Sequence, residues 1–216
     1  MENFFVQVVK EKFGYLVADY GFRVSDFSRS PRDYLWEGKI IYAATSTCIH
    51  IECTRGESPS FYIGRIKDDV LSIEGKGSYR ISFRIIYEYL LASKNQRNII
   101  TSLADRKHAQ KIINQEKNIN REMPVINDPE KQRVAEIDMY AKLIRKHAEP
   151  FLLGDFSLWL DLWEYLLARE IATQLDDGRS EYIDVVVPDG KGKFKIIGKK
   201  HIYQNWMDYI DKLKKE

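Results

Sequence analysis

The period of the apolar residues changes twice along the chain, and these changes constrain the fold more than any single motif does. Residues 3–20 repeat apolar side chains every three or four positions, as an amphipathic helix does. Residues 22–77 instead contain short β-rich runs separated by Ser, Thr, Gly and Pro, which is typical of an antiparallel meander. From Tyr79 the helical period returns. This order predicts an α+β fold rather than alternating βαβ units.

The elements can be placed approximately. In the meander, strands are expected at 38–45, 48–54 and 60–66, with further ones at 70–74 and 33–37. Helices are expected at 79–95, 98–117, 128–149 and from Phe156 to about Leu175; a hairpin follows at 182–197 and a closing helix at 202–214. Two ends have clear chemistry. Gly21 supplies a left-handed stop, and Asp128 is an N-cap followed by Pro129 and Glu130.

Composition describes an ordered globular protein. Hydrophobic residues make up 44% of the 216 and charged residues 31%, which is too much apolar material for intrinsic disorder. The chain divides into domains 1–95 and 96–216, or forms a single domain of 1–216. No apolar run approaches the roughly 20 residues of a membrane span, and the N-terminus does not resemble a signal peptide. A cytoplasmic protein without a membrane partner is expected.

Charge is distributed unevenly although the formal net charge is only +2. Residues 96–147 contain eleven Lys and Arg against seven Asp and Glu, whereas residues 148–180 contain two against seven. The small total argues against nucleic acid as the main partner. The contrast between the basic stretch at 96–147 and the acidic stretch at 148–180 is therefore the electrostatic feature to follow.

Both cysteines lie in one short run, Thr47-Cys48-Ile49-His50-Ile51-Glu52-Cys53. Strand alternation places Ile49, Ile51 and Cys53 on one face and Cys48, His50 and Glu52 on the other. The two cysteines are then roughly 16 Å apart and cannot form a disulfide with each other. A zinc site at Cys48 and His50 lacks two of its four ligands. We interpret the run as a half-buried strand with a polar face.

An enzymatic reading depends on two Glu-x-Lys pairs. Glu37 and Lys39 form the first pair, Glu74 and Lys76 the second, and acids precede each. A Mg²⁺-dependent nuclease needs carboxylates for the metal and a lysine for developing charge. With His50, these residues are the candidates for a Mg²⁺-dependent nuclease or other hydrolase. No motif specifies the reaction, and no metal or cofactor is predicted.

A third hypothesis is a nucleic-acid-binding accessory protein. It would use the basic stretches at 97–146 and 191–200, the latter containing Lys191, Lys193, Lys195, Lys199 and Lys200. The surrounding chain lacks the broad basic background of such proteins. The lysines are more typical of a solvated hairpin that resists edge pairing.

The most unusual segment is 156–167, with the sequence FSLWLDLWEYLL. Its apolar residues cover most sides of a helix, which indicates a buried helix. Alternatively, one edge is exposed. Trp159 would then form an acidic and aromatic docking surface with the carboxylates of Asp155, Asp161, Glu164 and Glu170. We predict partner binding at Asp155, Trp159, Asp161 and Glu164.

Two further stretches carry a resemblance, YGFRV at 20–24 and HAEPFLLGDFSLW at 147–159. Together with the order of helix, meander and helices, the chain resembles small bacterial proteins encoded beside polymorphic toxins and regarded as their immunity proteins. The resemblance implies a non-enzymatic protein that binds a cognate toxin and acts by occlusion. It implies no catalytic residue. An immunity protein is therefore the favoured hypothesis, with the hydrolase and the nucleic-acid-binding protein as alternatives.

Overall fold

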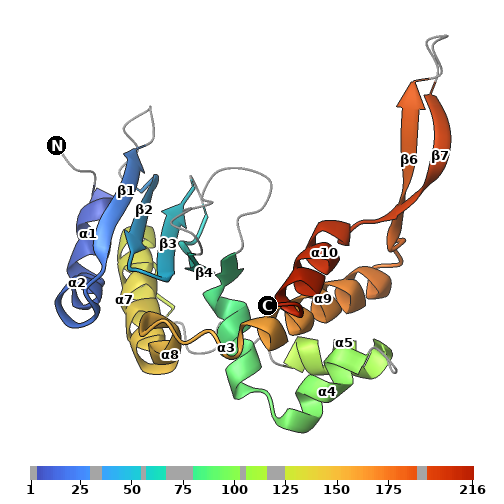
Figure 1. The fold of residues 1–216 in the computed structure, drawn as a ribbon. Helices are drawn as coiled ribbons and strands as arrows, with labels where there is room; N and C mark the ends of the chain where they lie inside the picture. Colours follow the sequence, from blue (N-terminus) through green and yellow to red (C-terminus); the bar gives the residue numbers. More distant parts are fainter. Residues whose placement is uncertain are drawn as a thin grey trace. The chain divides into compact units, whose positions relative to one another are not determined.

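The structure is a computed structural model that describes residues 4–29, 36–54, 57–66, 80–102, 106–115, 125–188 and 194–216. It has the predicted α+β architecture, with an N-terminal helical segment, an antiparallel meander, a helical middle and a C-terminal hairpin and helix (Figure 1). The chain forms two compact units, and each unit contains two stretches of sequence. Residues 118–157 belong to the first unit with 1–90, whereas the sequence-based division grouped them with the C-terminal half. Residues 91–117 and 158–216 form the second unit.

The first unit contains a five-stranded antiparallel sheet in which consecutive strands are neighbours. The strands are β1 (Arg23–Arg29), β2 (Gly38–Ala43), β3 (Thr47–Cys53), β4 (Ser60–Arg65) and β5 (Arg80–Ser82). The meander prediction is confirmed. β1 and β5 were not among the expected strands, and the expected strand at 70–74 lies outside the described residues.

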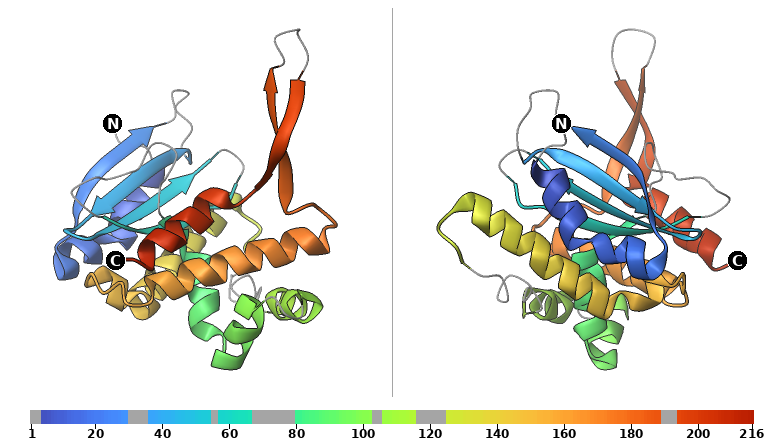
Figure 2. Two further views of the ribbon diagram at one scale, coloured as in Figure 1. Left: turned by 45° about the vertical axis from the view of Figure 1, so that its right-hand side comes forward. Right: turned by 90° about the vertical axis from the view of Figure 1, so that its left-hand side faces the viewer.

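Helices cover one face of this sheet (Figure 2). They are α1 (Phe4–Lys12), α2 (Gly14–Tyr20) and α7 (Pro129–His147); α3 (Phe83–Leu91) follows β5, and the short α8 (Glu149–Leu152) follows α7. The ring of Phe61 on β4 lies 5.9 Å from that of Phe13 and stacks at 4.3 Å on that of Tyr140 in α7. Phe61 and Phe13 are almost fully buried. The core of this unit therefore lies between the sheet and these helices.

The N-terminal helical segment is broken, although a single helix was expected over 3–20. Phe13 leaves the helical conformation between α1 and α2, with Gly14, a poor helix former, directly after it. The predicted stop is confirmed: Gly21 has a φ of 69°, which glycine adopts without a steric penalty. The backbone N–H of Phe22 then donates to the carbonyl of Leu16 at 3.0 Å, and the Phe22 side chain is buried.

The start of α7 follows its sequence signature. The carboxylate of Asp128 accepts hydrogen bonds from the backbone N–H groups of Glu130 and Lys131, and Pro129 occupies the first turn. After α8 the chain turns at Gly154, which has a φ of 83°. The hydroxyl of Thr47 on β3 donates to the carbonyl of Phe151 at 2.7 Å, which fastens α8 to the sheet.

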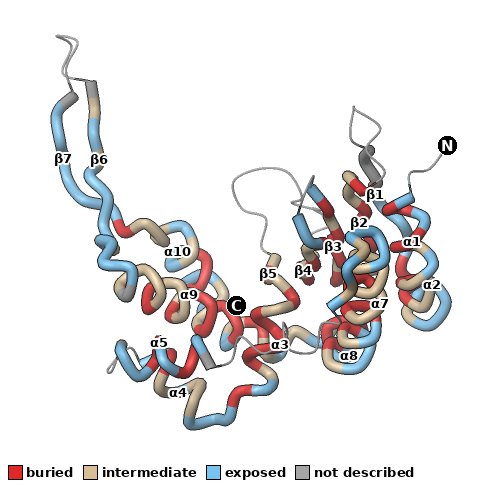
Figure 3. The backbone as a smooth tube through the Cα atoms, turned by 180° about the vertical axis from the view of Figure 1, so that it is seen from behind, coloured by how far each residue is buried: buried red, intermediate tan, exposed pale blue. Residues whose placement is uncertain are grey.

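The second unit is built around α9 (Trp159–Asp176). This helix contacts α4 (Lys94–Ser102), α5 (Arg106–Gln115) and α10 (Gln204–Leu213). The expected helix at 98–117 is thus two helices. The hairpin strands β6 (Tyr182–Pro188) and β7 (Phe194–His201) join α9 to α10 and form a separate two-stranded sheet. In Figure 3 the hairpin is mostly exposed while α9 is largely buried.

Candidate functional site

The outer face of the five-stranded sheet contains a polar cluster around an arginine. His50 Nε2 lies 3.0 Å from a carboxylate oxygen of Glu52, and the guanidinium of Arg80 lies 3.3 Å from His50 Nε2 and 3.6 Å from Glu52. The same guanidinium stacks over the ring of Tyr62, 4.1 Å from its centroid. As predicted, Cys48, His50 and Glu52 share this face, whereas Ile49, Ile51 and Cys53 are buried in the core.

The chemistry of this cluster is that of an internally paired network rather than of a reactive centre. Burial raises the pKa of Cys48 and of Cys53 to about 11, so both are neutral thiols at neutral pH. Burial also raises the pKa of Glu52, against the hydrogen bond with Tyr62 and the charge of Lys39, which lower it. The cation at the centre of the cluster is supplied by the protein itself, as Arg80.

Of the two Glu-x-Lys pairs in the hydrolase hypothesis, the described residues include only the first. Glu37 directly precedes β2, and Lys39 lies within it, paired in register with Glu52. Glu74 and Lys76 lie outside the described residues. Within the described ranges, no three His, Cys, Asp or Glu side chains gather in a way that would hold a metal ion.

The structure differs from the sequence-based prediction most clearly at the docking surface expected on α9. Trp159 is only 1% exposed, so the expectation that it lies at the surface is wrong. Its indole N–H donates to the phenol oxygen of Tyr209 at 3.0 Å, and its ring lies edge-on to that of Trp163. The physical reason is that α4, α5 and α10 all pack against α9, which leaves little of its apolar surface uncovered.

The three predicted carboxylates have different environments. Asp155 belongs to the first unit, where its exposed carboxylate accepts from the backbone N–H of Ser157 at 2.9 Å; this bond lowers the pKa of Asp155. Asp161 is exposed on the first turn of α9. Glu164, also on α9, forms an ion pair of 2.7 Å with Lys214, which follows α10. Asp161 and Glu164 therefore remain candidates for contact with a partner.

Glu164 lies at the edge of a cleft of about 300 Å³ within the second unit. We call this hollow the α9–α10 cleft. Its apolar lining residues are Leu167, Ala168, Ile171, Met207 and Ile210, and its polar ones are Thr101, Glu164, Asp211 and Lys214. Ile171 and Ile210 are buried and form its floor, whereas Met207 is 36% exposed. The residues from α4 and α10 were missed because nothing in the sequence indicates which helices flank α9.

The Glu164–Lys214 ion pair joins the two helices at this cleft. The hydrogen bond with Glu164 raises the pKa of Lys214 above its ordinary value. Both side chains are substantially exposed, at 39% and 50%, so solvent screens their attraction. The pair can therefore open at little cost when another cation approaches Glu164.

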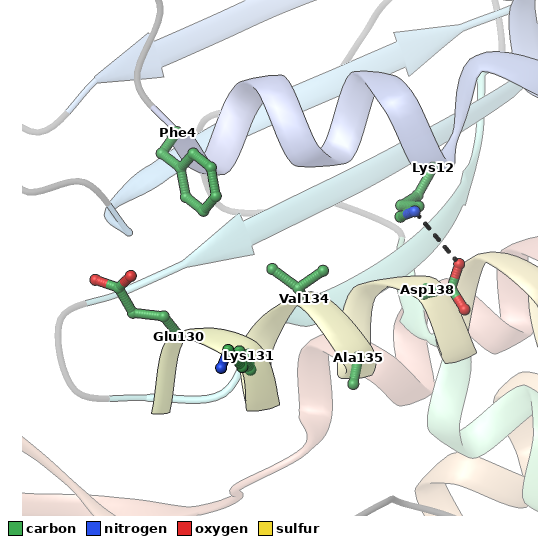
Figure 4. Close-up of a pocket in the computed structure, with 7 residues that line it drawn as sticks. All are labelled: Phe4, Lys12, Glu130, Lys131, Val134, Ala135 and Asp138. Atoms are coloured by element: carbon green, nitrogen blue, oxygen red, sulfur yellow. Dashed lines mark ion pairs between the residues drawn. The ribbon is translucent and has the colours of Figure 1, made fainter. Parts of the chain in front are cut away.

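A second hollow, of about 400 Å³, lies in the first unit between α1 and α7 (Figure 4). Phe4 stands over one end, and Lys12 and Asp138, 3.8 Å apart, mark the other. Its other apolar lining residues are Val134 and Ala135, which offer small side chains. The α9–α10 cleft has more apolar lining residues and contains a predicted partner-binding residue, so it is the better docking candidate.

The hairpin is the most exposed apolar feature of the described chain. About half of each side chain is exposed at five positions, namely Tyr182, Ile183, Val186, Ile196 and Ile197. The predicted hairpin is confirmed, although its turn at 189–193 lies outside the described residues. Lys195, Lys199 and Lys200 are exposed on β7. Apolar and basic side chains therefore share the exposed surface of the hairpin.

No family model, curated protein or solved structure matches this chain. The resemblance to immunity proteins therefore stays a prediction from the quoted stretches. Among the helices of the described ranges, none has both the length and the apolarity that a bilayer span requires.

Proposed function

We propose that the chain is a non-enzymatic protein-binding module, and most concretely an immunity protein that neutralises a cognate bacterial toxin by occluding it. The α9–α10 cleft is the observation that supports protein binding, because it combines an apolar floor with a charged rim. The toxin as partner is inferred only from the resemblance of residues 20–24 and 147–159.

The cleft suggests what the partner presents. An apolar side chain inserted between Leu167 and Met207 would remove both from water, and burial of one such side chain is worth roughly 1.5–3 kcal/mol. Methionine suits this role because its flexible thioether adapts to the inserted group. The cleft volume of about 300 Å³ fits one or two side chains rather than a whole helix.

The rim adds a preference for charge. Glu164 and Asp211 line the cleft, and Asp161 is exposed one turn of helix before Glu164. A partner arginine next to the apolar anchor would replace Lys214 at Glu164 with a bidentate contact. The expected epitope is therefore an apolar residue flanked by basic ones. Acidic residues around the cleft would also accelerate association with such a partner.

Capture followed by direct binding tests this proposal. The tagged chain is used to isolate partners from the source cells; the protein identified is then expressed, and its affinity is measured by titration calorimetry. Met207→Asp should weaken binding at least tenfold because it places a charge against the apolar wall. Val125→Asp is the matched control, since Val125 is 95% exposed in the other unit.

The captured partner also tests whether the chain is an immunity protein. If the partner is a toxin, its expression should arrest growth, and co-expression of the wild-type chain but not of Met207→Asp should restore it. A partner that binds Met207→Asp as tightly as wild type would refute the cleft as docking site. A partner that is harmless to cells would refute the role in immunity while leaving protein binding intact.

A further inference from the structure

β6 lies at the edge of its sheet but has the composition of a buried strand. Its sequence, YIDVVVP, contains three valines and one isoleucine and a single charged residue, Asp184. Such β-branched runs are typical of strands that are buried on both faces. In the structure the hairpin is a two-stranded sheet, and no further strand of the described chain pairs with β6.

β7 has the opposite character. Its sequence, FKIIGKKH, contains three lysines, and Lys195, Lys199 and Lys200 are all exposed. Lysine is a common means by which proteins keep the outer edge of a sheet from pairing with other chains. The strands therefore differ: three lysines protect β7 as an edge strand, whereas β6 has only Asp184 and the terminal Pro188.

An isolated hairpin is marginally stable in water, and three or more strands are usually needed for stability. The apolar residues of β6 are also poorly covered, with Ile183 54% and Val186 51% exposed. Added strands beside β6 would bury part of this surface and pair the edge backbone groups. The burial of apolar surface and the pairing of backbone groups both favour association over the lone hairpin.

We propose that β6 pairs antiparallel with β6 of a second copy of this chain, which gives a four-stranded sheet in the order β7–β6–β6–β7. The lysine-bearing strands then form both outer edges, where lysine is expected. The arrangement is a two-fold symmetric interface, the commonest kind among homo-oligomers. It uses a surface distinct from the α9–α10 cleft and does not depend on the proposed function.

The sequence of β6 allows it to pair with a second β6 in a register without opposed like charges. With the two-fold axis at Val185, Ile183 lies opposite Val187 of the second copy, and Asp184 lies opposite Val186 rather than opposite another carboxylate. Apolar cross-strand pairs of this type stabilise antiparallel sheets. Self-pairing through β7 is disfavoured instead, because the three lysines of each copy would be brought together.

Light scattering coupled to size-exclusion chromatography tests the proposal with the full chain. The wild type should elute with twice the 25.4 kDa mass of one chain. Val185→Lys places two lysines against each other at the axis and should yield a monomer. Ile197→Lys makes the same kind of change at an exposed site on β7 and should remain dimeric. Circular dichroism establishes that both variants are folded.

A cross-link keeps the proposal testable if Val185→Lys fails to fold. Residues directly opposite in an antiparallel pair have Cα atoms about 4.5–5.5 Å apart, within the range of a disulfide. Val185→Cys should therefore oxidise to a covalent dimer, whereas Ile197→Cys should not. A wild type that stays monomeric at its highest soluble concentration overturns the proposal. So does a dimer whose Val185→Lys and Ile197→Lys variants behave alike, or equal cross-linking of the two cysteine variants.

Discussion

The indole nitrogen of Trp159, at the start of α9, donates a hydrogen bond of 3.0 Å to the phenol oxygen of Tyr209 in α10. Both side chains are buried, at 1% and 9% exposure, so the bond replaces water for two polar groups of the core. It also ties the helix that precedes the hairpin to the one that follows it. Trp159 thus belongs to the interior of the second unit.

Removal of the Tyr209 hydroxyl, which accepts this hydrogen bond, should lower the stability of the fold. In Tyr209→Phe, the buried indole N–H loses this partner, and the expected loss of stability is about 1–3 kcal/mol. Urea denaturation followed by tryptophan fluorescence measures it. Tyr182→Phe, at a half-exposed position, should change the midpoint little. Equal midpoints for the two variants would show that the bond contributes nothing.

Truncation of the indole should be more severe. Trp159→Ala removes a large, fully buried side chain and is expected to cost about 3–5 kcal/mol. Loss of partner binding in this variant would therefore reflect loss of folding. Asp161→Lys, at an exposed position in the first turn of the same helix, should cost only about 0.3–1 kcal/mol through the helix dipole and is the informative test of the acidic rim. A stable Trp159→Ala protein would contradict the buried position.

Substitution by alanine is expected to have opposite effects on stability at two glycines. Gly154 has a φ of +83°, and an added Cβ would lie 2.5 Å from the hydroxyl oxygen of Ser46. Gly154→Ala should therefore destabilise the protein by at least about 1–2 kcal/mol from the left-handed backbone alone. Gly14, in the first turn of α2, has open space around the added Cβ, so Gly14→Ala should be neutral or stabilising by up to about 1 kcal/mol.

Thermal unfolding of these two variants distinguishes the causes. Ser46→Gly combined with Gly154→Ala removes the close contact but keeps the backbone strain. The double variant should regain only part of the lost stability. Full recovery would mean that the hydroxyl contact was the whole effect, and no loss in Gly154→Ala would contradict the turn geometry.

The two thiols should be inert in the folded protein. Burial raises the pKa of Cys48 and Cys53 from 9.0 to about 11, so very little thiolate exists at pH 8. An aromatic disulfide reagent should react slowly with the native chain and rapidly after denaturation. The same shift makes stability depend on pH. Because the pKa of each thiol is higher in the folded state, the stability contributed by the buried neutral thiols is fully present below pH 9 and is lost as the pH rises through about 11. Fast labelling of the native chain would contradict it.

The cap of α7 should depend on acid. The backbone N–H of Lys131, first among several donors, lowers the pKa of Asp128 below its ordinary value of 3.8. The stability it contributes is therefore present above pH 3.8 and is lost as the pH falls through the lowered pKa. Asp128→Asn keeps an oxygen acceptor without a charge, so its thermal midpoint should approach that of wild type in acid. A constant difference between the two at all pH values would refute the charge contribution.

Local chemistry was the part of this structure that sequence could predict. The Gly21 stop, the Asp128 cap and the two faces of β3 depend on neighbouring residues, and each is confirmed. The exposure of Trp159 was predicted wrongly because it depends on α4 and α10, which are distant in the chain. β1 was missed because its sequence, RVSDFSR, is mostly polar. The lining of the α9–α10 cleft has the same long-range origin.

The two-part composition of the first unit has a consequence for synthesis on the ribosome. The sheet is complete at residue 82, but Tyr140, which stacks on Phe61, belongs to a helix made only after residue 128. Until then the nascent chain exposes the face of the sheet that α7 later covers. The N-terminal ninety residues therefore leave the ribosome as an unfinished core, vulnerable to aggregation until α7 arrives.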